Sequence, residues 1–505
     1  MNENICITKN KTKKNISKKL EWDFNVPDNK NDILKICSLN VTGEITDCEM
    51  KEDSVLLKVK LNANMLYIPD VAPECEPKLS CLESTESFSI KGDMPLGMEY
   101  DFSDVCLFIR NASYELINSR KAGVRANVTA ILTLIKNREL SLKMPQDITI
   151  ETKTKNICAV HIPVQLSEKI AFSHSFSIPG GKPDIRELLR YTAEVKNKEV
   201  KAVSGKAVFK GNLGIKIIYA SNKNTVECFE VTLPFTEIAD AKGLNEDMEM
   251  MLMASSEDLC VKVYANDEAK ERNIDVTGYM HFNLTAFERN NAGIVCDAFC
   301  PDFKEECTYE EINYSDISKG LKDTYSYKET VSLSDTDVLE ICDVSAKVYN
   351  KEAVLESGKV NITSDIIYDI LYKSSNGIKC ERKISPFNFI QHSPDTKKYD
   401  TVELSCEVIN VSYMIASANS VEIRSNILFE SHLLKEEKIN AITEIKADKN
   451  EKCSLGRAPI VTYFPQGREE LFDIAKRYRT TVCALKELNS LTDDFVKEGE
   501  FIIIE

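Results

Sequence analysis

Histidine and glycine, residues common in hydrolytic and phosphate-binding sites, fall into no catalytic pattern in this sequence. No HExxH zinc motif, Gly-x-Ser-x-Gly elbow, Walker loop or dinucleotide fingerprint occurs. Gly211 and Gly214 lie inside an alternating, strand-like segment, where they cannot cradle a phosphate. His281 lies in another such segment, which predicts an outward-facing strand position. The sequence therefore predicts a protein that is not an enzyme. The five histidines are His161, His174, His281, His392 and His432.

Cysteine is abundant, with 17 residues, and its densest group is Cys296, Cys300 and Cys307. Structural zinc sites favour paired short spacings and four ligands, and no fourth ligand is evident near this group. We expect neither a metal nor another cofactor. In the absence of a recognisable secretory leader, the cysteines are expected to be reduced thiols that pack as small hydrophobic side chains.

The charge balance restricts the partners. The chain has 80 acidic and 64 basic residues and a net charge of -16, which disfavours nucleic acid and anionic membrane surfaces. No segment reaches the length of a membrane span, so we expect a cytosolic protein without membrane insertion. Residues 1–20 are rich in lysine and predict a basic, flexible arm.

An internal repeat organises most of the chain. The segment Ile33–Tyr67 aligns without a gap with Ile185–Tyr219 and with Val338–Tyr372. In each copy a turn leads into a run of alternating apolar and polar residues that ends in tyrosine, which is typical of a half-buried antiparallel strand. Later in each copy, a tyrosine (Tyr114, Tyr264 or Tyr413) precedes a second alternating run.

The opening of each copy suggests a helix. Pro183-Asp184 precedes apolar residues at Ile185, Leu188 and Leu189, which resembles an aspartate cap followed by a helical stripe. The predicted fold class is therefore mainly β with some α: three tandem antiparallel, sandwich-like repeats, each with one short helix.

The alignment also assigns two cysteines. Cys37 and Cys342 occupy the position that Leu189 fills in the second copy. A position that accepts leucine is expected to lie in a hydrophobic core rather than in a metal site.

The last segment has a different pattern. Val461 and Tyr463 suggest a strand, and Leu471, Ile474, Ala475 and Tyr478 recur on one face of a helix. Thr481 can cap a second helix that ends near Asn489, and residues 501–504 suggest a final strand. The order predicts a small βααβ domain.

These features resemble two known domain families. The Asn25-Val26-Pro27-Asp28 opening, the Ser-Gly-Lys turns of copies two and three and the tyrosine-ended strand resemble the SPOCS domain of spore coat proteins. The third copy departs most, because it lacks the proline. The C-terminal βααβ order is similar to a LysM domain. The expected boundaries are repeats over 21–140, 170–290 and 325–435, a linker over 436–458 and the LysM-like domain over 459–505.

The combined architecture resembles the coat morphogenetic proteins of sporulating Clostridia and Bacilli, whose clostridial member is the interaction partner of stage IV sporulation protein A. The resemblance implies a scaffold in the mother-cell cytoplasm, at the forespore surface and spore coat. Its LysM domain would bind that polymerising ATPase, and other coat proteins would be further partners. The alternative is a protein that binds N-acetylglucosamine in peptidoglycan or cortex.

The LysM loop favours a protein partner over a glycan. LysM domains that bind glycans often carry Gly-Asp-Thr at the first helix, and this chain has Gly467-Arg468-Glu469. A solvated helix start would explain the same charged residues. The expected partner-binding residues are Gly467, Arg468, Glu469, Leu471, Tyr478 and Asn489.

Overall fold

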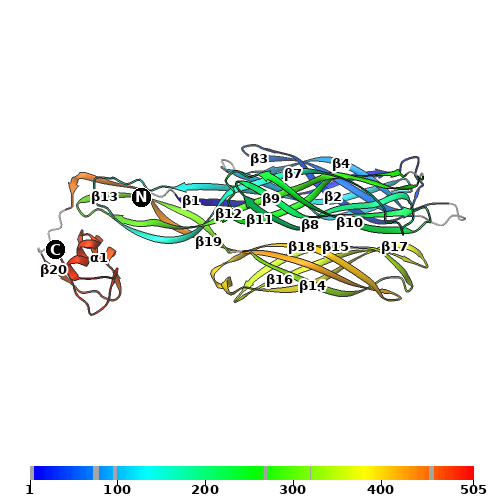
Figure 1. The fold of residues 1–505 in the computed structure, drawn as a ribbon. Coiled ribbons are helices and arrows are strands. Elements are labelled where there is room, and N and C mark those ends of the chain that lie inside the picture. The colour runs from blue at the N-terminus through cyan, green and yellow to red at the C-terminus, as the bar shows by residue number, and fades with distance from the viewer. Residues whose placement is uncertain are drawn as a thin grey trace.

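The computed structural model describes residues 5–71, 79–94, 99–266, 268, 270–318, 320–453 and 460–505. Nearly all of the chain before residue 453 is antiparallel β-structure (Figure 1). The strands are β1 (Ile5–Asn25), β2 (Ile33–Met50), β3 (Ser54–Pro69), β4 (Ser80–Asp93), β5 (Phe102–Asn118), β6 (Lys121–Leu140), β7 (Glu151–Ser177), β8 (Ile185–Val203), β9 (Lys206–Ser221), β10 (Val226–Asp240), β11 (Glu249–Ala265), β12 (Glu271–Phe299), β13 (Phe303–Ile317), β14 (Leu321–Ser332), β15 (Val338–Glu356), β16 (Lys359–Ser374), β17 (Gly377–His392), β18 (Thr401–Ser417) and β19 (Ser420–Lys452), with a 3-10 turn at Pro394–Lys398.

Each repeat is a sandwich of two antiparallel sheets, as the sequence predicts. In the first repeat, β2-β3-β4 packs on β5-β6-β1; the second repeat pairs β8-β9-β10 with β11-β12-β7. The third has β15-β16-β17 on one side, and β19 flanked by β14 and β18 on the other. The alternating residues fill the space between the sheets, and Val55, Leu57 and Val59 are fully buried there. The period-two pattern thus becomes the core of each sandwich.

The predicted opening helix is wrong, because Ile33, Ile185 and Val338 each begin a strand. In the second repeat, register shifts at Ile185/Glu187 and Leu188/Arg190 interrupt the pairing of β8 with β9. Each bulge adds one residue and changes which face the following side chains point to. A strand with two bulges therefore shows the same spacing of apolar residues as one face of a helix.

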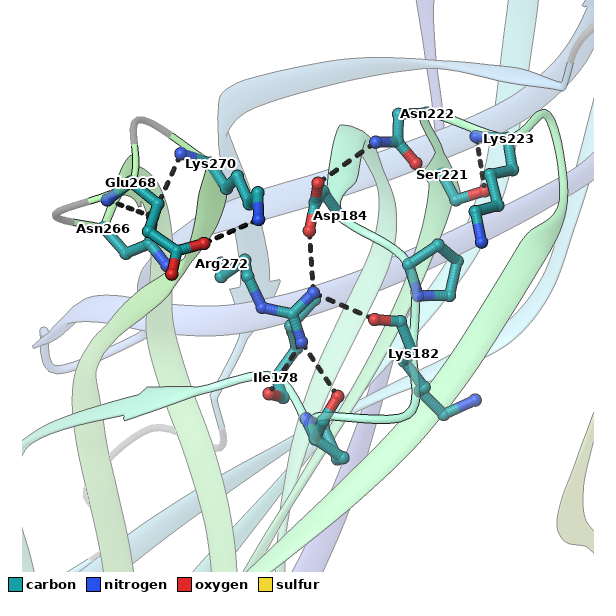
Figure 2. Close-up of polar contacts among 12 residues, drawn as sticks. Ile178, Lys182, Asp184, Ser221, Asn222, Lys223, Asn266, Glu268, Lys270 and Arg272 are labelled. Atoms are coloured by element: carbon teal, nitrogen blue, oxygen red, sulfur yellow. Dashed lines mark hydrogen bonds and ion pairs between the residues drawn. The ribbon is translucent and has the colours of Figure 1, made fainter.

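The Pro-Asp segment before this strand is a loop wrapped around an arginine (Figure 2). Arg272 donates to Asp184 at 2.7 Å and to the carbonyl oxygens of Lys182 and Pro179 at 2.9 and 3.0 Å. In the first repeat, Arg120 binds Asp32 and the carbonyls of Val26 and Pro27 in the same way. We call this arrangement the arginine clasp.

Among the described residues of the third repeat, no arginine clasp is formed. Asn419 takes the place of the arginine, and its backbone carbonyl accepts from the Leu333 amide at 2.8 Å, as the Arg272 carbonyl accepts from Ile178 at 2.9 Å. The opening of the third repeat, which lacks the proline, therefore differs in its side-chain contacts and keeps the same backbone contact.

The flexible arm expected over residues 1–20 is also corrected. Residues 5–20 belong to β1, which pairs with β6 from Ile5↔Leu140 to Asn25↔Lys121. Its lysines lie among other polar residues, and the apolar side chains of Ile16 and Leu20 enter the sandwich core. Lys11 and Lys13 reach the third repeat and pair with Glu403. Residues 1–4 lie outside the described residues.

The three repeats close into a ring. Strand β4 of the first repeat approaches β8 of the second, β10 approaches β15 of the third, and β17 returns to β2 of the first. Along the centre runs an apolar cluster to which all three repeats contribute, here called the axis cluster. It consists of Leu66, Leu79, Cys81, Leu189, Ile218, Ala220, Val226, Cys342 and Leu371, with Cys37, Cys228, Ile378 and Cys380 packed against it.

Long strands extend beyond the ring as a stalk (Figure 1). The outer parts of β1, β7, β12, β13 and β19, with the end of β6, twist together around a separate core. The linker expected over 436–458 is therefore corrected over its first part, since β19 continues through the stalk to Lys452; residues 454–459 lie outside the described residues. The stalk core is formed by Ile7, Leu140, Ile157, Ala159, Ala292, Ile294, Ile312, Tyr314, Ile439 and Ala441.

The C-terminal domain lies at the tip of the stalk and has the predicted βααβ order. Strand β20 (Val461–Tyr463) pairs with β23 (Ile502–Ile504), and a short ladder joins β21 (Glu469–Glu470) to β22 (Phe495–Val496). Helix α1 (Leu471–Tyr478) and helix α2 (Val482–Asn489) pack on these strands. The Thr481 hydroxyl caps α2 by accepting from the Ala484 amide at 3.1 Å, as its residue type predicts.

Candidate functional site

The C-terminal domain is attached to the stalk through one face of α1. Phe472 packs edge-on against Phe299 of β12, with ring centroids 5.3 Å apart. Around this contact Lys476 pairs with Asp297 at 2.6 Å, and Lys153 pairs with Asp473 at 3.2 Å. An aromatic contact surrounded by ion pairs gives the domain a defined position on the stalk.

The loop before α1 is closed by its own acidic residue. Glu469 accepts from the Gln466 amide at 2.9 Å and from the Tyr463 hydroxyl at 2.7 Å. These two donors lower the pKa of Glu469, so the carboxylate stays charged. The neighbouring Arg468 stacks its guanidinium over Phe495, 4.3 Å from the ring centroid. The loop is thereby joined to the segment that follows α2.

Two of the six predicted site residues are structural. Leu471 is fully buried in the core of the domain. The Asn489 side chain donates to the carbonyls of Leu485 and Ile503 and accepts from the Ile503 amide, at 2.7–2.9 Å. These contacts fasten the end of α2 to β23, and they leave neither residue free to recognise a partner.

The other four lie nearer the surface. Gly467, Arg468 and Glu469 form the loop just described, and Arg468 is exposed. Tyr478 is half-buried beside Tyr463, with ring centroids 5.8 Å apart. The structure thus brings the three loop residues together and keeps Tyr478 as a partial core residue.

Sequence reasoning missed an exposed aromatic pair on this domain. Phe464 and Phe501 follow and precede the paired strands β20 and β23, with ring centroids 6.4 Å apart. They are 64% and 61% exposed, among the most exposed apolar side chains of the chain. Exposed aromatic residues in contact are a common feature of protein-binding surfaces. The sequence signal for this pair was Phe501, an aromatic residue directly before the apolar run Ile502–Ile504. In the structure its side chain stays outside the core.

A second feature is a central cavity of about 3050 Å³ between the repeats. It lies beside the axis cluster and is far larger than the roughly 300–1,000 Å³ of ordinary small-molecule pockets. Its charged residues largely satisfy one another: Lys216 pairs with Asp343, and Arg382 pairs with Asp369 at 2.7 Å. Burial disfavours the charge of Lys216, but Asp343 outweighs it and raises the lysine pKa. The Lys216–Asp343 pair joins the second repeat to the third across the cavity wall, whereas the Arg382–Asp369 pair lies within the third repeat.

The other residues with chemical potential are part of the framework. His281 lies on the outer face of its sheet, as predicted, between Glu257 at 2.7 Å and Ser167 at 2.8 Å, and ties three adjacent strands together. Cys296 lies in β12, Cys300 directly follows this strand, and Cys307 lies in β13. Within the described ranges, no cluster of three or more histidine, cysteine, aspartate or glutamate residues is arranged to hold a metal ion. The described helices include none with the length and apolar character needed to cross a membrane.

The comparisons with known proteins match this organisation. The family model described as "SipL, SPOCS domain" matches residues 32–117, 184–264 and 337–416, and the LysM domain model matches residues 469–505. Each SPOCS match covers the second to fifth strands of a sandwich and leaves out the first and last. Searches of curated proteins and of solved structures found no match.

Both matched domains are non-catalytic binding domains, and the name of the first connects the chain with sporulation. Three sandwiches of one type in a ring, followed by a βααβ domain on a stalk, agree in order and position with these matches. The chain is therefore a sporulation-related SPOCS-plus-LysM protein, with three SPOCS domains and one C-terminal LysM domain.

Proposed function

We propose that the chain is a non-enzymatic scaffold for spore coat assembly that binds the coat basement-layer ATPase, stage IV sporulation protein A, through its LysM domain. The observation that carries this proposal is the exposed Phe464–Phe501 pair. Solvated aromatic rings in contact gain free energy when a protein partner covers them. The stalk holds the LysM domain away from the ring, where a partner that polymerises on a surface can reach it.

The altered LysM loop supports a protein rather than a glycan as the ligand. Arg468 stacks on Phe495, and Glu469 is occupied by Tyr463 and Gln466. The Glu469 carboxylate is thus occupied inside the loop, and the exposed Arg468 guanidinium is held against an aromatic ring. The three SPOCS domains would then carry other coat proteins, at the forespore surface in the mother-cell cytoplasm.

The binding test uses the purified full-length chain and the ATPase. We expect the double variant F464A/F501A to weaken binding by at least about thirtyfold, since a single central aromatic residue contributes about 2 kcal/mol or more at such interfaces. L488A removes a less exposed apolar side chain from α2 of the same domain and is the matched control. Equal affinity of F464A/F501A and the unmodified chain would refute the assigned surface.

Two further measurements separate the alternatives. Calorimetry of the full-length chain with chitin oligosaccharides should detect no binding. Micromolar affinity would instead favour the hypothesis that the LysM domain binds N-acetylglucosamine. In sporulating cells, a fluorescent fusion lacking residues 459–505 should fail to encircle the forespore. Normal encirclement by this truncated chain would contradict the anchoring role of the LysM domain.

A further inference from the structure

The ring has three junctions between repeats, and cysteines occupy corresponding positions in them. One set lies on β4, β10 and β17, the last strand of each three-stranded sheet that faces the axis. In each repeat this cysteine pairs across the sheet with an apolar residue of the axis cluster: Cys81 with Leu66, Cys228 with Ile218, and Cys380 with Leu371. The three cysteines are therefore related by the approximate threefold arrangement of the repeats.

The second set lies on the first strand of the same sheets. Pairing skips one residue between Ile36 and Ser38, between Leu188 and Arg190, and between Ile341 and Asp343. The bulge residues are Cys37, Leu189 and Cys342, which all belong to or pack against the axis cluster. This position, which the sequence identified as a core site, points toward the neighbouring repeat rather than into its own sandwich.

At two of the three junctions, a cysteine of the first set and a cysteine of the second set lie on strands that face each other. Strand β10 meets β15 with Cα atoms within 8 Å, and Cys228 Sγ lies 4.0 Å from Asp343, the residue next to Cys342. Strand β17 meets β2 in the same way, and Cys37 and Cys380 both pack against the axis cluster.

At the third junction the partner of the cysteine is a leucine. Cys81 donates its thiol to the Leu188 carbonyl at 3.0 Å, beside Leu189. The three junctions therefore share one geometry, with a cysteine pair at two and a cysteine–leucine pair at one.

We propose that Cys228–Cys342 and Cys37–Cys380 are inter-repeat oxidation sites, whose disulfides lock the ring of SPOCS domains covalently. Each bond forms from two thiols by exchange with an oxidised thiol reagent such as glutathione disulfide. One protein thiolate displaces a glutathione thiolate, and the second protein thiol then resolves the mixed disulfide. One protein disulfide and two molecules of reduced glutathione result, so the electrons pass to the reagent. All four thiols are free in this structure.

Burial controls the rate of this exchange. It raises the pKa of Cys37 and Cys228 to about 11, and that of Cys342 and Cys380 to about 12. Because the thiolate is the reacting species, the closed ring resists oxidation. Opening of a junction exposes its thiols, and the bond forms when the junction closes again. The lock would thus form slowly and persist once made.

The test oxidises the full-length chain with glutathione disulfide, alkylates the remaining thiols and identifies linked peptides by mass spectrometry without reduction. We expect Cys228–Cys342 and Cys37–Cys380 links as the main products, with Cys81 recovered in alkylated form. Cys260 and Cys483 are exposed and serve as internal controls for random oxidation. C37L and C342L should each remove only one link, since leucine already occupies this position in the second repeat.

The symmetry of the ring supplies a positive control. L189C should create a third link, to Cys81, because it restores at that junction the pair found at the other two. The proposal fails if the principal links between two protein cysteines involve Cys260 or Cys483, if the linked cysteines are distributed at random, or if no inter-repeat link forms after prolonged oxidation. Failure of L189C to add the Cys81 link would also overturn the assigned geometry.

Discussion

The arginine clasp of the second repeat makes a quantitative prediction. Arg272 has only 17% of its side chain exposed and Asp184 only 21%. Removing the guanidinium deletes one charge-assisted contact to Asp184 and the contacts to the Lys182 and Pro179 carbonyls. A hydrogen bond to a charged group contributes about 1.5–3 kcal/mol, and contacts that share one donor are not additive. We therefore expect R272A to lower the free energy of local opening by about 3 kcal/mol.

Amide hydrogen exchange is the suitable assay, because a chain with several domains need not unfold in one step. The reporters are the Ile178 amide, which donates to the Arg272 carbonyl at 2.9 Å, and the Lys182 amide, which donates to Pro179 at 3.0 Å. A loss of 3 kcal/mol corresponds to exchange that is roughly 100-fold faster. R272K keeps the charge but loses the planar fork, and it should give an intermediate rate.

The first repeat supplies the matched control. Arg120 makes the same type of contact to Asp32, but the two side chains are 41% and 39% exposed. Solvent screening should limit the effect of R120A at the Val26 amide to about 1 kcal/mol. The reasoning would be refuted if R272A left the Ile178 and Lys182 amides protected, or if R120A had the larger effect.

Three further predictions concern the ring, the stalk and the LysM domain. Burial by itself would raise the pKa of Glu403, but Lys11 and Lys13 hold this pKa at about 2, below its usual 4.5. The stability that this contact contributes is therefore present above pH 4.5 and is lost as the pH falls toward 2. E403Q should remove up to about 3 kcal/mol of this pH dependence from the free energy of unfolding between pH 4.5 and 2. F299A removes the aromatic contact with α1 and should free the LysM domain, seen as faster tumbling of that domain by NMR relaxation; unchanged relaxation would contradict the docking. N489A removes three internal hydrogen bonds and should destabilise the LysM domain by about 2–3 kcal/mol in exchange measurements, whereas an unaltered exchange rate at the Ile503 amide would argue against its structural role.

The sandwich fold and the LysM fold could be predicted because both depend on local patterns. The alternation of apolar and polar residues along β3, as in Val55, Leu57 and Val59, specifies which face of the strand is buried. It does so independently of which sheet packs against that face. The βααβ order follows from a helical stripe and from Thr481 as a cap. The helix expected at Ile185 failed for an equally local reason: two bulges changed the periodicity, and a bulge depends on how the partner strand pairs.

What the sequence alone determined is therefore the repeat, the type of each domain and the apolar character of single positions such as Leu189. Only the tertiary structure decided that this position faces a neighbouring repeat, that residues 5–20 form a strand, and that the ends of several strands combine into a stalk. The physical reason is that alternation records which side chains are removed from water and not what covers them. The covering surface at each junction comes from a repeat more than a hundred residues away in the chain, and its identity is fixed by how whole sheets pack.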